Sequence, residues 1–183
     1  MNLDLSIDIE NIQGSFDRIA KDILRKSAVQ INSDVYQITE IEFYFYHPEH
    51  KDEYTHKHER DEGEWRFHNA GVDITLQVTD DQDGGILIRA VKFNSDDNVN
   101  YILGPRKVLG AWFASFGKVT SESKIKLVSI IELDIEIIRT FRHLPNKIVC
   151  EEFHDKKYRY LVDIDVYPNA LKEKIKADFE IVV

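Results

Sequence analysis

The sequence has a single cysteine, no long apolar run and no flexible linker, and each shortage excludes a class of protein. Cys150 alone cannot build a disulfide framework or a cysteine-based zinc site. No apolar stretch approaches the length of a membrane span, and the first residues lack the basic-then-apolar layout of a secretory signal. We therefore expect one domain, residues 1–183, in a soluble cytoplasmic protein.

Positive charge is also in short supply, since 24 basic and 33 acidic residues give a formal net charge of −9. Nucleic-acid-binding proteins usually carry a basic footprint, so this balance counts against such a partner. The cations are nevertheless concentrated between residues 104 and 159, whereas much of the acid lies in 49–64 and 80–83. A basic face on an acidic protein therefore remains an alternative to ordinary surface lysines.

Apolar patterning favours a mixed fold with more strand than helix. Ser15 is expected to cap a helix over 16–26, and Gly104 and Pro105 to open a second helix that ends at Gly117. Segment 80–85 is expected to be a turn. Strands are expected over 35–46, 65–68, 72–78, 86–93, 126–138 and 158–167. Few of these spacings fit a β-α-β unit, so we predict an α+β domain with a curved, mainly antiparallel sheet and a few helices.

The strand over residues 36–46 carries the most informative pattern. Alternation places Ile41, Phe43 and Phe45 on one face. The opposite face receives two carboxylates and two phenols, namely Glu40, Glu42, Tyr44 and Tyr46. Such a face suits a site for a flat, polar molecule, but a half-exposed strand with an acidic solvent face would have the same pattern.

Arg89 lies inside an apolar strand and needs a carboxylate partner, because an unpaired buried charge is costly. Glu40 and Glu42 are the candidates, in a site or in a purely structural ion pair.

Five histidines occur in or near the polar segment 47–62, which we expect to be a long loop. They are His47, His50, His56, His58 and His68. Imidazoles are common metal ligands, but these spacings match no strong zinc motif, so we predict no metal site.

Arg106 and Lys107 occupy the first turn of the second helix, where the helix dipole prefers anions. An anion docked on the free N–H groups would explain them, and so would two side chains that simply reach solvent. They are our candidate contacts to the phosphates of a nucleic acid.

The order of several short segments resembles the alkyladenine (3-methyladenine) DNA glycosylase family, monofunctional enzymes that remove alkylated and deaminated purines. The resemblance covers roughly the first two thirds of the chain, and its specificity comes from the collinear series rather than from any one motif. The segments are Phe16-Asp17, Glu40-Ile41-Glu42-Phe43-Tyr44, a loop histidine, Gly63 with an aromatic strand, Gly84-Gly85-Ile86-Leu87-Ile88-Arg89-Ala90, and Gly104-Pro105-Arg106-Lys107.

The resemblance implies catalytic roles for two of these residues. Glu42 would be the general base that activates water, and Arg89 would hold that water and the carboxylate. Loss of the base leaves an oxocarbenium-like sugar, which a nearby carboxylate can stabilise. No lysine is placed for Schiff-base chemistry, and no cofactor is implied.

The resemblance also implies which residues hold the extruded base. Tyr44 would stack on it, with His56 on its other side or edge, although His58 is close enough to compete. His68 would stand where the family has a further stacking aromatic residue, and Asp73 lies near an asparagine with which the family rejects guanine.

Two departures concern the nucleic acid itself. The family presses a bulky side chain into the gap left by the flipped nucleotide, whereas residues 69–71 here are small and polar, and the preceding loop is short and acidic. Besides excision of damaged purines from double- or single-stranded DNA, the sequence therefore leaves two alternatives. One is a non-catalytic relative that binds a purine-like ligand or a protein, and the other is a hydrolase of nucleosides.

Overall fold

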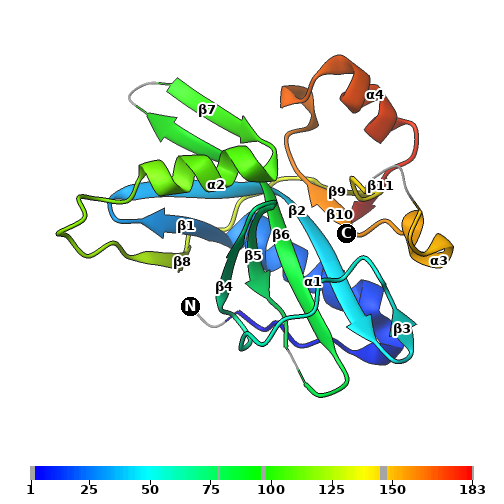
Figure 1. The fold of residues 1–183 in the computed structure, drawn as a ribbon. Coiled ribbons are helices and arrows are strands. Elements are labelled where there is room, and N and C mark those ends of the chain that lie inside the picture. Colours follow the sequence, from blue (N-terminus) through cyan, green and yellow to red (C-terminus); the bar gives the residue numbers. More distant parts are fainter. Residues whose placement is uncertain (1–2, 78, 96–97, 145–147, 183) are drawn as a thin grey trace.

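The computed structural model describes residues 3–77, 79–95, 98–144 and 148–182. Its long central strands, β2 and β6, pair antiparallel, as do all the strand pairs described in the sheet (Figure 1). The sheet runs in the order β11-β9-β10-β2-β6-β5-β4, with β1, β3, β7 and β8 attached beside this path. The predicted α+β architecture with a mainly antiparallel sheet is confirmed.

The elements have the following bounds: η1 Ile9–Asn11, α1 Ile12–Lys26, β1 Ser27–Ile31, β2 Asp34–His47, β3 His50–Lys51, β4 Trp65–His68, β5 Gly71–Thr75, β6 Asp83–Ser95, β7 Asn98–Leu103, α2 Pro105–Ala114, β8 Ile125–Ser129, β9 Ile137–Thr140, α3 Glu151–His154, β10 Arg159–Leu161, η2 Ile164–Val166, α4 Asn169–Lys176 and β11 Glu180–Val182.

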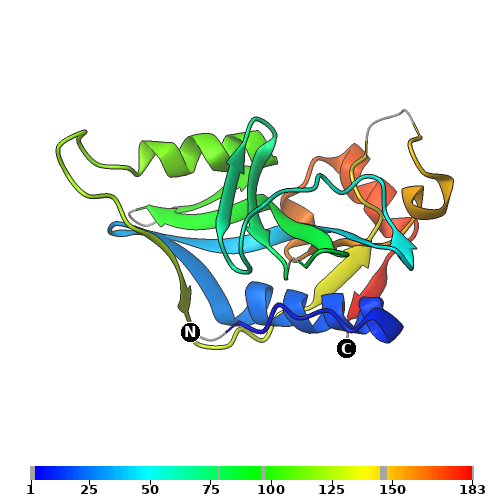
Figure 2. The same cartoon turned by 60° about the horizontal axis from the view of Figure 1, so that its bottom comes forward.

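Helix α1 covers one face of the sheet, below it in the view of Figure 2. Its fully buried stripe includes the predicted Ile19, Ala20, Ile23 and Leu24. Phe16 stacks on Phe43 of β2, with ring centroids 4.3 Å apart. The apolar face of β2 therefore meets the apolar stripe of α1 and forms the main core.

The start of α1 was predicted wrongly. Asn11, not Ser15, caps the helix by accepting a hydrogen bond from the Gly14 N–H. Ser15 lies within the first turn, where its hydroxyl accepts from the Asp8 N–H and donates to the Asn11 carbonyl. Both residues are good caps, and the choice between them depends on the preceding chain.

The two carboxylates on the other face of β2 are covered as well, so that face is not an acidic solvent face, although Tyr44 and Tyr46 are half-buried. Glu40 and Glu42 are 2% and 0% exposed. A small second core lies on this side, and its buried members come from β9, β10, α4 and the chain between them: Ile138, Leu161, Tyr167 and Ile175. The strict alternation is interrupted by register shifts around Glu40, which keep Ile38 and Ile41 in one core although they are three residues apart.

Three further boundaries differ from the prediction. β6 begins at Asp83, so Gly84 and Gly85 lie within a strand instead of a turn. A Cβ at Gly84 would lie 2.7 Å from the Tyr44 carbonyl oxygen, and this close approach explains the glycine. β5 ends at Thr75, and Val78 lies outside the described residues. Helix α2 ends at Ala114, before Gly117, and leaves Phe113 49% exposed.

The two long strands predicted in the last third of the chain are shorter than expected. Segment 126–138 divides into β8 and β9, because the chain between them binds the end of α1 through the Ile130 and Leu133 N–H groups. Ile131 is consequently 90% exposed. Segment 158–167 forms β10 and the short helix η2, separated by Asp163 with a left-handed φ of 55°.

Candidate functional site

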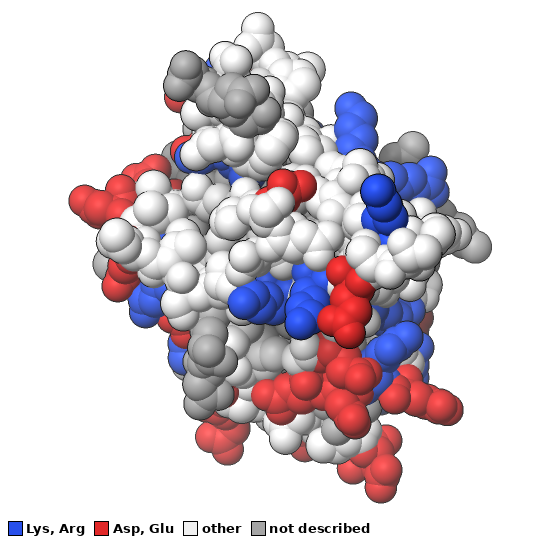
Figure 3. Space-filling view, turned by 90° about the vertical axis from the view of Figure 1, so that its left-hand side faces the viewer, with Lys and Arg blue, Asp and Glu red and all other residues white. Residues whose placement is uncertain are grey.

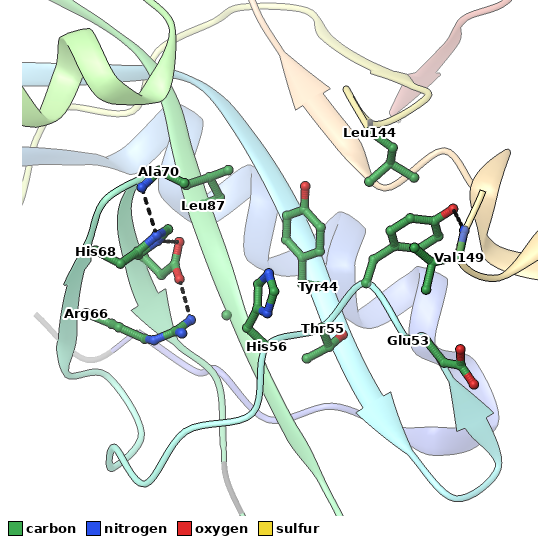
Figure 4. A pocket seen from close by; sticks show the side chains of 13 residues that line it. Tyr44, Glu53, Thr55, His56, Arg66, His68, Ala70, Leu87, Leu144 and Val149 are labelled. Atoms are coloured by element: carbon green, nitrogen blue, oxygen red, sulfur yellow. Dashed lines mark hydrogen bonds and ion pairs between the residues drawn. The ribbon is translucent and has the colours of Figure 1, made fainter. Parts of the chain in front are cut away.

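The hairpin of β4 and β5 rises from the sheet between α2 and the C-terminal elements (Figure 2). A cavity of about 300 Å³ lies beside this hairpin, a volume suited to a small ligand. It brings together four of the residues singled out from the sequence: Tyr44, His56, His68 and Asp73. The remaining lining residues are Glu53, Tyr54, Thr55, Arg66, Ala70, Gly85, Leu87, Leu144 and Val149 (Figure 4).

Strand register explains why these side chains converge. Tyr44 pairs with Gly85, Asp73 pairs with Leu87, and Arg66 pairs with Asp73. Residues opposite each other on paired strands point to the same face of a sheet. Because Gly85 has no side chain, the floor of the cavity is open between Tyr44 and Asp73.

Glu42 contacts Tyr44 and does not line the cavity. Its Oε2 accepts a hydrogen bond of 2.8 Å from the Tyr44 hydroxyl and one of 3.2 Å from Arg89. Its Oε1 accepts one of 2.6 Å from the backbone N–H of His143. Burial, together with the nearby Glu42 carboxylate, raises the pKa of Tyr44 well above its usual value, so the phenol stays protonated and donates. Glu42 therefore connects to the cavity through Tyr44 alone among these contacts.

Arg89 has the carboxylate partner that the sequence predicted, and in fact has two. It donates to Glu40 Oε1 at 2.8 Å and to Glu42 Oε2 at 3.2 Å. Burial disfavours the charged guanidinium, but the carboxylates of Glu42 and Glu40 outweigh burial and raise the pKa of Arg89. Arg89 is thus a permanent cation that ties the two glutamates together.

Glu40 is held by residues from the last third of the chain. Arg159 donates to its Oε1 at 2.7 Å, and the Tyr167 hydroxyl donates to its Oε2 at 2.7 Å. Burial alone would raise the pKa of Glu40, but Arg159, Arg89 and Tyr167 hold it below its usual value. We call Glu40, Glu42, Arg89, Arg159 and Tyr167 the sealed cluster.

A second charged group lies on the cavity wall. Asp73 Oδ2 accepts from Arg66 at 3.1 Å, and Asp73 Oδ1 lies 3.1 Å from His68 Nε2. Figure 4 shows His68 and Arg66 side by side on the hairpin, facing the cavity from across Tyr44. We call Asp73, Arg66 and His68 the wall cluster.

Sequence reasoning missed the support behind Tyr44. The guanidinium of Arg142 lies 4.9 Å from the Tyr44 ring centroid and pairs with Asp52 at 2.5 Å, and both of these charged side chains are fully buried. Arg142 also lies over the rings of Tyr54 and Tyr158. A lone arginine and a loop aspartate, ninety residues apart, carry no local signal of this pairing.

The histidines of the loop have different roles. His56 is exposed and lines the cavity, whereas His58 contacts Asp83 and the Gly84 carbonyl. His50 is buried between the Phe45 carbonyl and the Tyr158 hydroxyl, and burial lowers its pKa. Over residues 3–77, 79–95, 98–144 and 148–182, no three His, Cys, Asp or Glu side chains are grouped to hold a metal.

Arg106 and Lys107 are exposed at the start of α2 and do not line the cavity. The start of α2 nevertheless abuts the hairpin, since a Cβ at Gly71 would lie 2.8 Å from Pro105 Cβ. The face in Figure 3 is mixed in charge, with a dense acidic group in the lower part of the view. Lys147, one of the cations in the basic stretch, lies outside the described residues. Within the described part of the chain, no helix has the length and apolarity needed to cross a membrane.

The sequence matches no model of a known protein family, and a comparison with curated proteins finds no significant match.

Proposed function

We propose that this protein binds a flat, purine-like base in the cavity beside Tyr44 and hydrolyses the N-glycosidic bond that joins the base to its sugar. The substrate would be a damaged purine in DNA, as in a monofunctional DNA glycosylase. One observation carries the proposal: the ring that lines the cavity bonds through its hydroxyl to a buried carboxylate, which a permanent cation also holds. This arrangement puts a stacking surface and a general base within one hydrogen bond of each other.

The chemistry follows from these groups. A base extruded from the strand stacks on Tyr44, with His56 and His68 at its borders. The bond from C1′ to the base nitrogen breaks, the base leaves with the electron pair, and the Glu42 carboxylate stabilises the cationic sugar. Water adds its oxygen to C1′ and gives one proton to Glu42, which returns it to solvent. Hypoxanthine leaves a neutral nucleotide as an anion and takes one proton from solvent, whereas 3-methyladenine leaves a cationic nucleotide as a neutral base and needs none. The Tyr44 hydroxyl must first release Oε2 of Glu42, because it occupies the position that this water needs.

Release of hypoxanthine or 3-methyladenine from single- and double-stranded oligonucleotides tests the proposal. Glu42→Gln should bind the damaged strand but release no base, with circular dichroism to verify its fold. Glu42 accepts hydrogen bonds from three donors, and the NH₂ group of a glutamine side chain would face at least one of them. Two donors would then point at each other, which destabilises the folded variant. Glu42→Asp keeps the negative charge but moves it away from the cavity by one methylene group, and should slow release of the base at least tenfold. Wild-type rates in both folded variants would exclude Glu42 from the reaction.

A second candidate function is binding of the base without hydrolysis. It is favoured by the full burial of Glu42 and by the three donors that already occupy both of its oxygens. Under this alternative the wild-type protein binds purine nucleosides and releases no base from any strand, and Glu42 serves only to fix Tyr44.

A further inference from the structure

The wall cluster presents an acceptor and a donor side by side to whatever occupies the cavity. Asp73 is 6% exposed, and its carboxylate has about four acceptor positions, of which Arg66 uses one. His68 Nε2 lies 3.1 Å from Oδ1 but makes no hydrogen bond to it. Arg66 has five N–H groups and uses one on Asp73, and its side chain is 23% exposed. Free acceptor and donor capacity thus lies on the same wall.

The two ring nitrogens of His68 have different surroundings. The Ala70 N–H donates to His68 Nδ1 at 3.3 Å, and Nε2 lies 3.1 Å from Asp73 Oδ1. Nε2 makes no hydrogen bond there, so the Asp73 carboxylate keeps acceptor positions for the cavity. The pairing of Asp73 with Arg66 is also fixed by register, because the two residues lie opposite each other on β5 and β4.

Purines differ in the edge that they offer to such a wall. Guanine has adjacent donors at N1 and the 2-amino group and an acceptor at O6, whereas adenine has an acceptor at N1 and a donor at N6. A carboxylate matches the two guanine donors, and a guanidinium matches O6. Against the same wall, adenine N1 would place its lone pair beside the carboxylate lone pairs.

We propose that the wall cluster makes the cavity specific for a guanine-type base, a 2-amino-6-oxopurine, with Asp73 accepting from N1–H and the 2-amino group and Arg66 donating to O6. The inference rests on the binding step of the proposed function and does not need the hydrolysis. The open floor at Gly85 gives the ring room beside Asp73, since a Cβ there would lie 3.4 Å from Asp73 Cβ. Alkylation of guanine at N3 or N7 leaves this edge unchanged. Hypoxanthine keeps N1–H and O6 but lacks the 2-amino group, and 3-methyladenine has neither N1–H nor O6.

The test is binding of guanosine, inosine and adenosine to the full chain, followed by NMR titration. Guanosine should bind roughly ten- to a hundredfold more tightly than adenosine, with inosine between them because it lacks the 2-amino group. Asp73→Asn should weaken guanosine about tenfold and leave adenosine unchanged or tighter, because an amide offers a donor to N1. Glu64→Gln is the matched control: it removes another carboxylate that pairs with an arginine, Arg60, outside the cavity, and it should change neither affinity.

Each outcome separates this inference from the function on which it rests. Equal binding of guanosine and adenosine, or equal weakening of both by Asp73→Asn, would contradict the proposed preference for guanine. Neither result would contradict the proposal that the cavity binds a base. Guanosine binding with the expected order but without base release supports the specificity and excludes only hydrolysis. If Asp73→Asn fails to fold, Arg66→Lys is the second variant. It keeps the positive charge beside Asp73 and should still lower the ratio of guanosine affinity to adenosine affinity. Failure of all three nucleosides to bind overturns the inference and the binding step together.

Discussion

The sealed cluster and the wall cluster use the same ingredients and differ in what surrounds them. Both place a carboxylate beside an arginine on the same side of the sheet, the first around Glu40 and the second around Asp73. Glu40 is enclosed by residues of the last third of the chain, whereas Arg66 and His68 keep about a quarter of their side-chain surface exposed. Burial alone therefore does not identify a functional carboxylate. Free hydrogen-bonding capacity toward a cavity distinguishes the two clusters.

The largest effect is expected from removing one charge of the sealed cluster. Glu40→Gln should lower the free energy of unfolding by about 3–5 kcal/mol, because Arg159 loses its buried partner. Asp73→Asn should cost only about 1–2 kcal/mol, because solvent reaches its partners. Urea denaturation measures both, and similar losses would remove the distinction between the clusters.

The stability difference between the wild type and Glu40→Gln should become smaller at low pH. The folded protein holds the pKa of Glu40 below its usual value of 4.5, so its contribution to stability is complete above about pH 4.5. The contribution is lost as the pH falls through the lower pKa of the folded state. The stability gap between wild type and Glu40→Gln should therefore shrink below pH 4.5. Other carboxylates with lowered pKa values, such as Glu180, are present in both proteins and cancel in the comparison. A gap that stays constant down to pH 3 would contradict this assignment.

Filling the floor of the cavity tests the wall cluster without changing its charges. Gly85→Val should reduce nucleoside binding tenfold or more, roughly 1.4 kcal/mol, because its side chain projects between Tyr44 and Asp73. The fold should persist, since the nearest atoms to a Cβ there lie 3.4 Å and 3.6 Å away. Gly110→Ala is the control in open space on α2, and it should leave binding unchanged. Unaltered binding in Gly85→Val would place the ligand outside this cavity.

The smallest effect on nucleoside binding is expected where the two regions meet, at the Tyr44 hydroxyl. Tyr44→Phe keeps the stacking ring and removes one donor to Glu42, at a cost of about 1–2 kcal/mol in unfolding free energy. It also frees Oε2 for water, so base release should be retained or faster while nucleoside affinity changes little. Tyr36→Phe removes a hydroxyl that bonds Ser115 far from Glu42 and serves as the control. Loss of base release in Tyr44→Phe would assign the hydroxyl itself a part in the reaction.

The features that could be predicted from the sequence are those set by residues close together along the chain. Period-two alternation was sufficient to place Glu42 and Tyr44 on one face of a strand, and the unpaired charge of Arg89 was sufficient to predict its carboxylate partners. Four of the proposed ligand contacts do line one cavity. Arg142, Asp52, Arg159 and Tyr167 were missed, because each acquires its role only through a contact about ninety or more residues away.

The same limit applies to the last third of the fold. The alternation of 126–138 predicted one strand, but hydrogen bonds from this segment to the end of α1 divide it. Asp163 adopts a left-handed conformation that a strand-like pattern does not reveal. Tertiary contacts overrode local preference in both places.

The large sequence separation between β2 and some of its partners has a consequence for biosynthesis. The His143 N–H that binds Glu42 is separated from it by 101 positions, and Arg159 is 119 positions from Glu40. At typical translation rates, β2 leaves the ribosome roughly 5–20 s before His143 and Arg159, although Arg89 follows Glu42 after 47 positions and Glu40 after 49. During that interval the central strand stays open at the edge that β10 later occupies. The order of the chain therefore leaves one edge of β2 without its neighbour until β10 has been made, and such an edge is exposed to pairing with other chains.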